Sequence, residues 1–479
     1  MKTITFLIVC LCFISAAITG WAQVDTGTLV GSVKDTSGAV LPSASVTARN
    51  VDTGASTSAK TDADGNYVLT PLKIGTYSLS VEAAGFQKEV RNGIVLNVQQ
   101  NIRLDFTVAV GSVSQTAVVS GEAPLVETES ASLGDVIASQ QAEQMPLNGR
   151  RYTDLATLTA GVSKITEGPV NGSATPTNGN AGGDFSVNGT RGDQNNFILD
   201  GVDNNSNDNG DLAFVTSVDA IAEFKVQTSN YSAEFGRSAG AVINATTKSG
   251  TNEIHGSAWE FLRNDVLDAR GYFESPDSPK APYRQNQFGG TLGGPIIKNN
   301  TFFFVDYEGT RIGSAETDFA TVPTSAEQTG DFSDILGAQT GVDALGRPVY
   351  TNEIYNPATT RSVNGQTVRD GFGFDPSSGL PIPGQANVIN QGLSSVGLNY
   401  AALYPAPNVP GTFANNYTVN APGSQKVDQM DARVDENITS KIQLFARYSH
   451  AQSTRFQAPV FSGKWGSCLS TVDSTGSGC

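Results

Sequence analysis

The side chains that could carry out chemistry are few and widely separated in this chain. It contains two histidines, His255 and His450, and neither has a second metal-type ligand at a spacing that recurs in zinc enzymes. No nucleophile with a neighbouring base and no acid–base pair of carboxylates can be assembled from the sequence. We therefore expect no enzymatic activity, no cofactor and no metal centre.

Two clusters of oxygen ligands remain. Asp62, Asp64 and Asn66 have the spacing that begins a calcium loop, but the acidic residue that closes such a loop is missing, so a hairpin turn at Asp64-Gly65 is the favoured interpretation. The second cluster is an acidic, Asn-rich loop that could face an external ligand or bind a cation, or could be a solvated loop. Its candidate ligand-facing residues are Asp200, Asp203, Asn204, Asn205, Asp208 and Asp211.

The composition limits the class of protein. With 46 acidic against 30 basic residues, the formal charge is -16, which repels phosphates and excludes nucleic acid as a partner. The 51 glycines and 38% hydrophobic content are typical of a turn-rich β protein. The length predicts about three domains.

Residues 1–22 have the features of a secretory signal peptide. Lys2 precedes an apolar run from Ile4 to Ile18, and the spacing of Gly20 and Ala22 predicts cleavage before Gln23. No second apolar stretch of about 18 residues follows, so any membrane span must be β. The remaining cysteines, Cys468 and Cys479, could form a disulfide in an exported protein, and the sequence leaves their pairing open.

Residues 23–110 alternate short Val-rich runs with turn signals. Tyr77, Leu79 and Val81 fall on one face of a strand, and the pattern predicts a seven-strand β-sandwich of about 85 residues. The runs are Gly27–Asp35, Ser45–Asn50, Thr61–Leu69 and Thr76–Phe86. They resemble the carboxypeptidase-regulatory-like domain found in front of many large outer-membrane receptors, which implies a structural or partner-binding module.

Residues 111–132 form a polar, β-branched linker. Its core QTAVVSG resembles the TonB box, the short segment that adds as a strand to the sheet of the energy-transducing TonB protein. The alternatives are a final sandwich strand and a simple linker. The candidate residues are Gln115, Thr116, Ala117, Val118, Val119, Ser120 and Gly121.

Residues 133–250 change character, with a short helix expected around Gln140 to Met145 among Asn- and Gly-rich loops and scattered strands. Three ordered segments resemble the plug of TonB-dependent receptors, and the resemblance implies a polar, displaceable domain in a wide lumen. They are MPLNGRRYTDLATLTAGV (Met145 to Val162), FSVNGTRGDQNNFILDGVDNN (Phe185 to Asn205) and VDAIAEFKVQTSNYSAEFGRSAGAVINATTKSG (Val218 to Gly250).

Residues 251–479 contain stretches with the length and alternation of tilted membrane strands. Trp259 and Phe261 suit an aromatic girdle, and Phe303, Val305 and Tyr307 share the expected lipid face. The predicted strands are Ile254–Asn264, Arg284–Ile296, Thr301–Arg311 and two within Asp428–Ser449, with turns at 298–300 and 436–439. The connection from Ile312 to Lys426 is the leading candidate for ligand contact, because loops this long usually bind something or are disordered.

The chain is therefore expected to be mainly β, with an N-terminal sandwich and a mixed α/β plug on the periplasmic side, followed by the first strands of an antiparallel transmembrane β-barrel. Receptors of this type close about 22 strands, so five strands predict an N-terminal fragment. The resemblance implies energy-dependent uptake of a carbohydrate, peptide or metal chelate, with a TonB-type protein, outer-membrane lipid and the external ligand as partners. The alternative is a non-transporting surface binding or adhesion protein.

Overall fold

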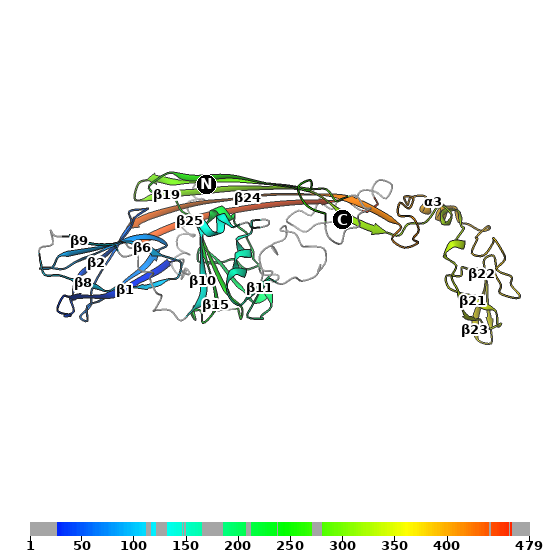
Figure 1. Ribbon diagram of the computed structural model, residues 1–479, viewed down its shortest axis with the longest axis horizontal. Coiled ribbons are helices and arrows are strands. Elements are labelled where there is room, and N and C mark those ends of the chain that lie inside the picture. The colour runs from blue at the N-terminus through cyan, green and yellow to red at the C-terminus, as the bar shows by residue number, and fades with distance from the viewer. Residues whose placement is uncertain are drawn as a thin grey trace, which may run out of the picture. The chain divides into compact units, whose positions relative to one another are not determined.

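The computed structural model in Figure 1 describes residues 26–111, 116–120, 132–145, 147, 150–164, 185–206, 212–236, 238–270, 280–439, 442–458 and 460–461. The expected signal peptide and both C-terminal cysteines lie outside these residues. The chain forms two compact units. The first comprises Met1–Leu262, Asn286–Arg311 and Lys426–Thr454, and the second comprises Arg263–Gln285, Ile312–Gln425 and Arg455–Cys479.

The first unit begins with a sandwich of two sheets. One sheet has the order β4-β1-β7, with β8 also paired to β1, and the other has the order β3-β2-β5-β6-β9. The strands are β1 (Thr26–Asp35), β2 (Ser45–Asn50), β3 (Ser56–Lys60), β4 (Asn66–Lys73), β5 (Gly75–Glu82), β6 (Lys88–Leu96), β7 (Asn101–Arg103), β8 (Phe106–Val108) and β9 (Thr116–Ser120). The prediction of seven strands was wrong, because the two sheets contain nine. Two of them, β7 and β8, have only three residues each, and β9 lies in the expected linker.

The sandwich core follows the predicted alternation. Tyr77, Leu79 and Val81 are all buried, which confirms that they share one face of β5. The turn at Asp64-Gly65 is also present, with Gly65 at φ +75°, but it is not a hairpin, because β3 pairs with β2 and β4 pairs with β1. The chain crosses there between sheets whose apolar faces both need burial.

The plug is a five-stranded sheet in the order β10-β15-β16-β13-β14 with short helices around it. Its elements include β10 (Leu133–Ala138), α2 (Ser139–Gln144), η2 (Tyr152–Leu158), β11 (Val162–Lys164), β12 (Phe185–Val187), η3 (Gly192–Gln194), β13 (Asn196–Leu199), β14 (Val202–Asp203), η4 (Val218–Ala220), β15 (Ile221–Ser229) and β16 (Val242–Thr247). The position of α2 confirms the predicted short helix. All six residues of β16 are buried, as expected for a strand covered on both faces.

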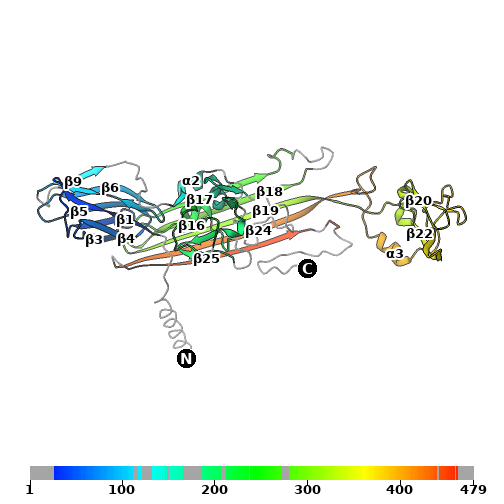
Figure 2. The same ribbon diagram turned by 90° about the horizontal axis from the view of Figure 1, so that it is seen from below.

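Five long strands follow in the order β17-β18-β19-β24-β25, and Figure 2 shows them running beside one another. They are β17 (His255–Asn264), β18 (Tyr283–Ile297), β19 (Thr301–Ala320), β24 (Tyr417–Thr439) and β25 (Ile442–Gln457). The expected turn at 298–300 is confirmed, whereas the turn predicted at 436–439 was placed too early, because β24 continues to Thr439. Among the described residues, β17 and β25 each pair on one side only, so the sheet is not closed.

The two faces of β19 differ as predicted. Val305 and Tyr307 are 39% and 41% exposed, whereas the alternating residues Phe304, Asp306 and Glu308 are buried. The girdle prediction for Trp259 and Phe261 was wrong. Both rings share one face, but the guanidinium of plug residue Arg150 lies over them, at 4.3 Å from the centre of the Phe261 ring, since aromatic faces attract cations.

The second unit contains most of the long connection, which is folded. Because β19 runs to Ala320 and β24 starts at Tyr417, the connection between strands is shorter than predicted. It contains η5 (Glu327–Thr329), η6 (Ser333–Ile335), β20 (Gln339–Val342), β21 (Pro348–Tyr350), β22 (Tyr355–Val363), β23 (Gln366–Gly371) and α3 (Ser395–Ala401). Strand β20 pairs with β21, and β22 pairs with β23. No helix within the described ranges is long and apolar enough to span a membrane.

Candidate functional site: a buried latch between plug and barrel strands

The site begins with Asp200 at the end of plug strand β13. Asp200 and Gly201 both have left-handed backbone conformations, with φ of +50° and +78°, and this pair turns the chain back into β14. Aspartate tolerates that conformation better than most residues with a Cβ. The turn leaves the Asp200 carboxylate buried, with only 2% of the residue exposed.

Each oxygen of Asp200 has two polar partners. Oδ1 accepts from the Thr247 backbone N–H at 2.8 Å and from Arg433 Nη1 at 2.9 Å. Oδ2 accepts from the Thr247 hydroxyl at 2.8 Å and pairs with Arg447 Nε at 3.0 Å. The plug therefore presents one fully satisfied carboxylate to two arginines of the barrel strands.

The arginines reach the plug because of the two-residue period of their strands. Asp431, Arg433 and Asp435 alternate along β24 and are all buried, whereas Val434 between them is 43% exposed on the opposite face. Arg447 comes from the neighbouring strand β25. The same alternation that gives these strands an apolar outer face gives them a charged inner one.

Arg433 is shared between two carboxylates. Its Nε and Nη2 donate to the two oxygens of Asp435 at 2.9 and 3.0 Å, and its Nη1 donates to Asp200. The Arg433 side chain is only 3% exposed. This forked geometry satisfies a buried guanidinium, which would otherwise be strongly destabilising.

A second row of polar contacts joins the plug to the strands. The Thr216 hydroxyl donates to Asp431 Oδ2 at 2.6 Å, and the Ser217 hydroxyl donates to Glu308 Oε2 at 3.4 Å. All of these side chains are buried. Together with the Asp200 pairs, they form the plug latch, defined here as Asp200, Thr216, Ser217, Thr247, Glu308, Asp431, Arg433, Asp435 and Arg447.

Arg150 anchors another part of the plug. It forms a buried ion pair with Asp219 while its guanidinium lies over the Phe261 ring. Burial raises the pKa of the Asp219 carboxyl, and the charge of Arg150 opposes that increase. The interaction therefore combines an ion pair within the plug with a cation–π contact to β17.

The sandwich contributes contacts to the same unit. Lys73 of β4 donates to Asp435 at 2.7 Å, so a charge from the N-terminal domain pairs with a carboxylate of the latch. The Val98 backbone N–H donates to Glu223 of the plug, and Lys225 donates to the Gln99 carbonyl at 3.3 Å. Burial raises the pKa of Glu223 to about 7.

The residues predicted to face a ligand have diverse surroundings. Asp200 is in the latch, and Asn204 holds the loop by donating to and accepting from Phe214 at 2.9 and 3.0 Å. Asn205 accepts from the Phe197 N–H at 3.0 Å, and Asp203 is exposed. Asp208 and Asp211 lie outside the described residues. A ligand-facing role for this set stays a prediction, and Asp203 is the described member with the most accessible side chain.

The candidate TonB box is partly described. Residues Thr116 to Ser120 form β9, which pairs in parallel with β6, while Gln115 and Gly121 lie outside the described residues. This pairing corresponds to the alternative of a final sandwich strand. It does not test whether the segment also binds a TonB-type protein.

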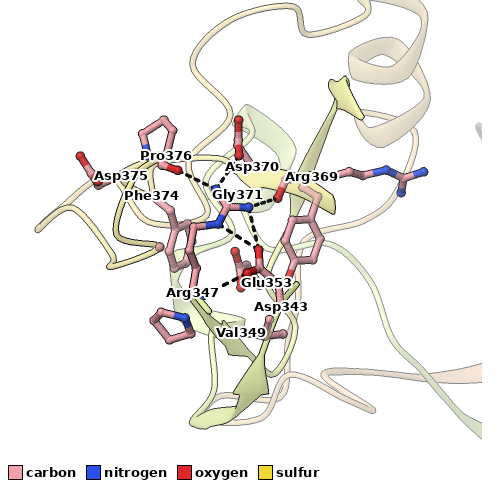
Figure 3. A pocket seen from close by; sticks show the side chains of 13 residues that line it. Asp343, Arg347, Val349, Glu353, Arg369, Asp370, Gly371, Phe374, Asp375 and Pro376 are labelled. Atoms are coloured by element: carbon pink, nitrogen blue, oxygen red, sulfur yellow. Dashed lines mark hydrogen bonds and ion pairs between the residues drawn. The ribbon is translucent and has the colours of Figure 1, made fainter. Parts of the chain in front are cut away.

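The second unit has a pocket around Arg347, shown in Figure 3. Arg347 donates to Asp343 and Asp370, each at a closest distance of 2.7 Å, and to the carbonyls of Arg369 and Pro376 at 3.1 and 2.7 Å. The side chain is only 5% exposed. Because its donors are already occupied, this cluster holds the fold of the connection together and is not a free cationic site. Across the described ranges, no group of acidic, histidine and cysteine side chains could hold a metal ion.

Sequence reasoning missed most of the latch. The sequence alone assigns no role to Asp431, Arg433 or Asp435. The available signal was the run DARVD, in which charges occupy every second position of a predicted membrane strand. Such charges must face the barrel interior, because the lipid face cannot accept them at low cost.

Comparisons with known proteins agree with this arrangement. The model described as "Carboxypeptidase regulatory-like domain" matches residues 28–109, "TonB-dependent Receptor Plug Domain" matches residues 128–243, and "Outer membrane beta barrel domain" matches residues 246–477. The TonB-dependent transporter Oar of Myxococcus xanthus is 28% identical over 301 residues, which cover 60% of this chain and 27% of Oar. The chain thus spans about a quarter of the length of that relative.

Two solved structures that match this chain have lower sequence identity to it than Oar does. The siderophore receptor PirA of Acinetobacter baumannii is 15% identical, with a TM-score of 0.30, over 68% of this chain and 40% of PirA. The outer-membrane transporter YddB of Escherichia coli is 11% identical, with the same TM-score of 0.30, over 68% of this chain and 37% of YddB. These TM-scores carry no argument about fold or ligand. The ordered sandwich, plug and barrel matches, the Oar relative and the plug seated on barrel strands lead to one assignment: the chain belongs to the TonB-dependent outer-membrane receptors with an N-terminal regulatory-like domain.

Proposed function

We propose that the full-length receptor takes up an external ligand across the outer membrane with energy supplied by a TonB-type protein, and that the plug latch closes the path until the plug is displaced. The observation that carries this proposal is the buried set of ion pairs between Asp200 and two barrel arginines. While these ion pairs are buried, losing one partner is costly, because it leaves the other charge unpaired and away from water. Once the plug moves, water can solvate both partners.

The rest of the assignment follows from the same proposal. The signal peptide is cleaved before Gln23, and the sandwich and plug lie on the periplasmic side, where a TonB-type protein can reach them. The chain acts as a receptor and not as an enzyme. The folded connection of the second unit and the exposed Asp203 are the proposed ligand-contacting parts.

Movement of the plug can be tested without knowing the ligand. Thr216 is 1% exposed and its hydroxyl contacts Asp431, so Thr216→Cys in the full-length receptor should react slowly with a maleimide while the latch is closed. In energised cells grown in complex medium, we expect labelling to be faster by about tenfold than in cells lacking TonB, because displacement exposes the thiol.

Ala156→Cys provides the matched control, since Ala156 is 0% exposed within the apolar core of the plug. Labelling of this cysteine reports unfolding of the plug and not its release from the strands. Equal labelling of Thr216→Cys with and without TonB would contradict transport and favour a non-transporting surface protein.

A further inference from the structure

A turn of the sandwich lies against one face of the plug sheet. The turn is residues 97–100, between β6 and β7, and it is tied to β1 by the Thr28 N–H, which donates to the Gln100 carbonyl at 2.9 Å. Val98 within the turn is 0% exposed but is not among the residues that form the sandwich core. Its backbone N–H donates to Glu223 of the plug, so the sandwich presents this residue to the plug.

The face of the plug that contacts this turn is polar. Alternation along β15 directs Phe224 and Val226 into the apolar core of the plug, so Glu223 and Lys225 lie on the opposite face. Both are nevertheless buried, at 6% and 3% exposed. The Lys225 ammonium donates to the carbonyl of Gln99 in the turn, at 3.3 Å. A carboxyl group and an ammonium group of the plug therefore both contact the main chain of the sandwich.

The neutral polar groups of this interface are incompletely paired. Thr246 of β16 is the register partner of Glu223 and is 2% exposed. Asn244, the register partner of Lys225, is 1% exposed. Within the residues that the structure describes, the Thr246 hydroxyl and the side-chain amides of Asn244 and Gln99 have no hydrogen-bond partner. Burying such groups is costly, and water can bond them once the sandwich leaves, so the contact is suited to opening reversibly.

The charge of Glu223 depends on whether the sandwich is in place. Burial raises the pKa of its carboxyl to about 7, while the hydrogen bond from the Val98 N–H and the charge of Lys225 oppose the increase. When the sandwich leaves, water reaches the carboxyl and its pKa returns toward the ordinary value of 4.5.

Few other charges face this carboxyl from the elements around it. Its register partners, Ala138 on β10 and Thr246 on β16, are neutral, and so is the sandwich turn. Lys248, just beyond β16, pairs with Glu143 of α2. Lys225 is therefore the charged group of the described chain that acts on Glu223.

We propose that the sandwich docks on the plug through a reversible contact that takes up a proton at Glu223, so that mild acid holds the two domains together and alkaline conditions separate them. Between pH 4.5 and about 7 the docked state binds more protons than the undocked state. Docking is therefore strongest below this range and weakens as the pH rises through 7. The inference goes beyond the proposed function, because it requires neither the plug latch nor a TonB-type protein. It makes the sandwich a pH-dependent restraint on the plug.

The thiol of Val98→Cys tests docking directly, because position 98 is buried outside the sandwich core and the substitution keeps its backbone N–H. The variant is made in the full-length receptor with the other cysteines replaced by serine, and it is purified in detergent without a TonB-type protein. Maleimide labelling rates are measured between about pH 6 and about pH 8. Because thiolate is the reacting form, the rate for Thr36→Cys, an exposed position after β1, is divided by that for Val98→Cys at each pH. This ratio is the protection of position 98.

We expect this protection to be about tenfold greater at pH 6 than at pH 8, because proton linkage changes the docking constant by about that factor. Glu223→Gln should remove the pH dependence and keep the protection near its pH 6 value, since glutamine is neutral and still accepts a hydrogen bond. Glu89→Gln is the matched control. It removes another buried carboxylate, which pairs with Arg91 within β6, and it should retain the tenfold change.

A second cysteine distinguishes separation of the domains from unfolding. Ala48→Cys lies in the sandwich core at 0% exposed and should stay protected throughout the pH range. Equal protection of Val98→Cys at both pH values, or the same change in Glu223→Gln, would overturn the inference. A parallel loss of protection at Ala48→Cys would also overturn it, because the thiol would then report unfolding of the sandwich. None of these results bears on transport, which the TonB-dependent labelling of Thr216→Cys tests separately.

Discussion

Replacing Arg433 with methionine is expected to lower the free energy of unfolding of the plug and its supporting strands by about 3–5 kcal/mol. The change removes the cation that lies between Asp200 and Asp435, both of which remain buried. Lys73 still pairs with Asp435, and Arg447 still pairs with Asp200, but neither can supply the forked contacts of Arg433. Chemical denaturation of the full-length receptor in detergent measures the change.

Arg263→Met is the matched control, because it removes an exposed ion pair with Asp268 from a barrel strand. Such exposed pairs contribute about 0–1 kcal/mol. Arg433→Lys should be intermediate, since lysine retains the charge but lacks the planar fork. If Arg433→Met costs no more than Arg263→Met, the latch does not stabilise the plug.

The second large effect is expected in the folded connection. Arg347→Met should destabilise this module by about 2–3 kcal/mol, because Asp343 loses its arginine partner, Asp370 keeps only Arg361, and two carbonyls lose a donor. The loss should appear as rapid proteolytic cleavage between residues 321 and 416, with the sandwich and plug left intact.

Arg369→Met serves as the comparison for that experiment. Arg369 is exposed, and its Nε donates to the Thr360 hydroxyl at 3.1 Å. Its removal should leave the cleavage rate nearly unchanged. Equal sensitivity of the two variants would mean that the Arg347 cluster is not the element that holds the module together.

The strands and their faces could be predicted because they depend on local pattern. Alternation at period two gave the outward positions of Val305 and Tyr307, and turn chemistry gave the tight connection at Asn299, whose φ is +65°. The same rule placed Trp259 and Phe261 on one face correctly. It could not say which face, because that depends on the plug residue Arg150, more than 100 positions earlier in the chain.

The latch could not be predicted for the same physical reason. Asp200 and Arg433 are 233 positions apart, and nothing local to either indicates the other. The loop that begins at Asp200 has the composition of a ligand-binding loop, since Asp and Asn are common in both turns and binding sites. Likewise, the parallel partner of β9 is determined by the packing of the sandwich and not by the sequence QTAVVSG.

Entry of vancomycin into cells that express the full-length receptor shows whether the buried ion pairs at Asp200 keep the plug seated. Asp200→Asn keeps the size of the side chain but removes the charge that Arg433 and Arg447 share. We expect it to sensitise cells to vancomycin by about tenfold at equal surface abundance, because a loosened plug opens a wide lumen. Asp203→Asn, at an exposed position on the same plug, should have no effect. Unchanged resistance in Asp200→Asn, or equal sensitivity in both variants, would contradict the latch.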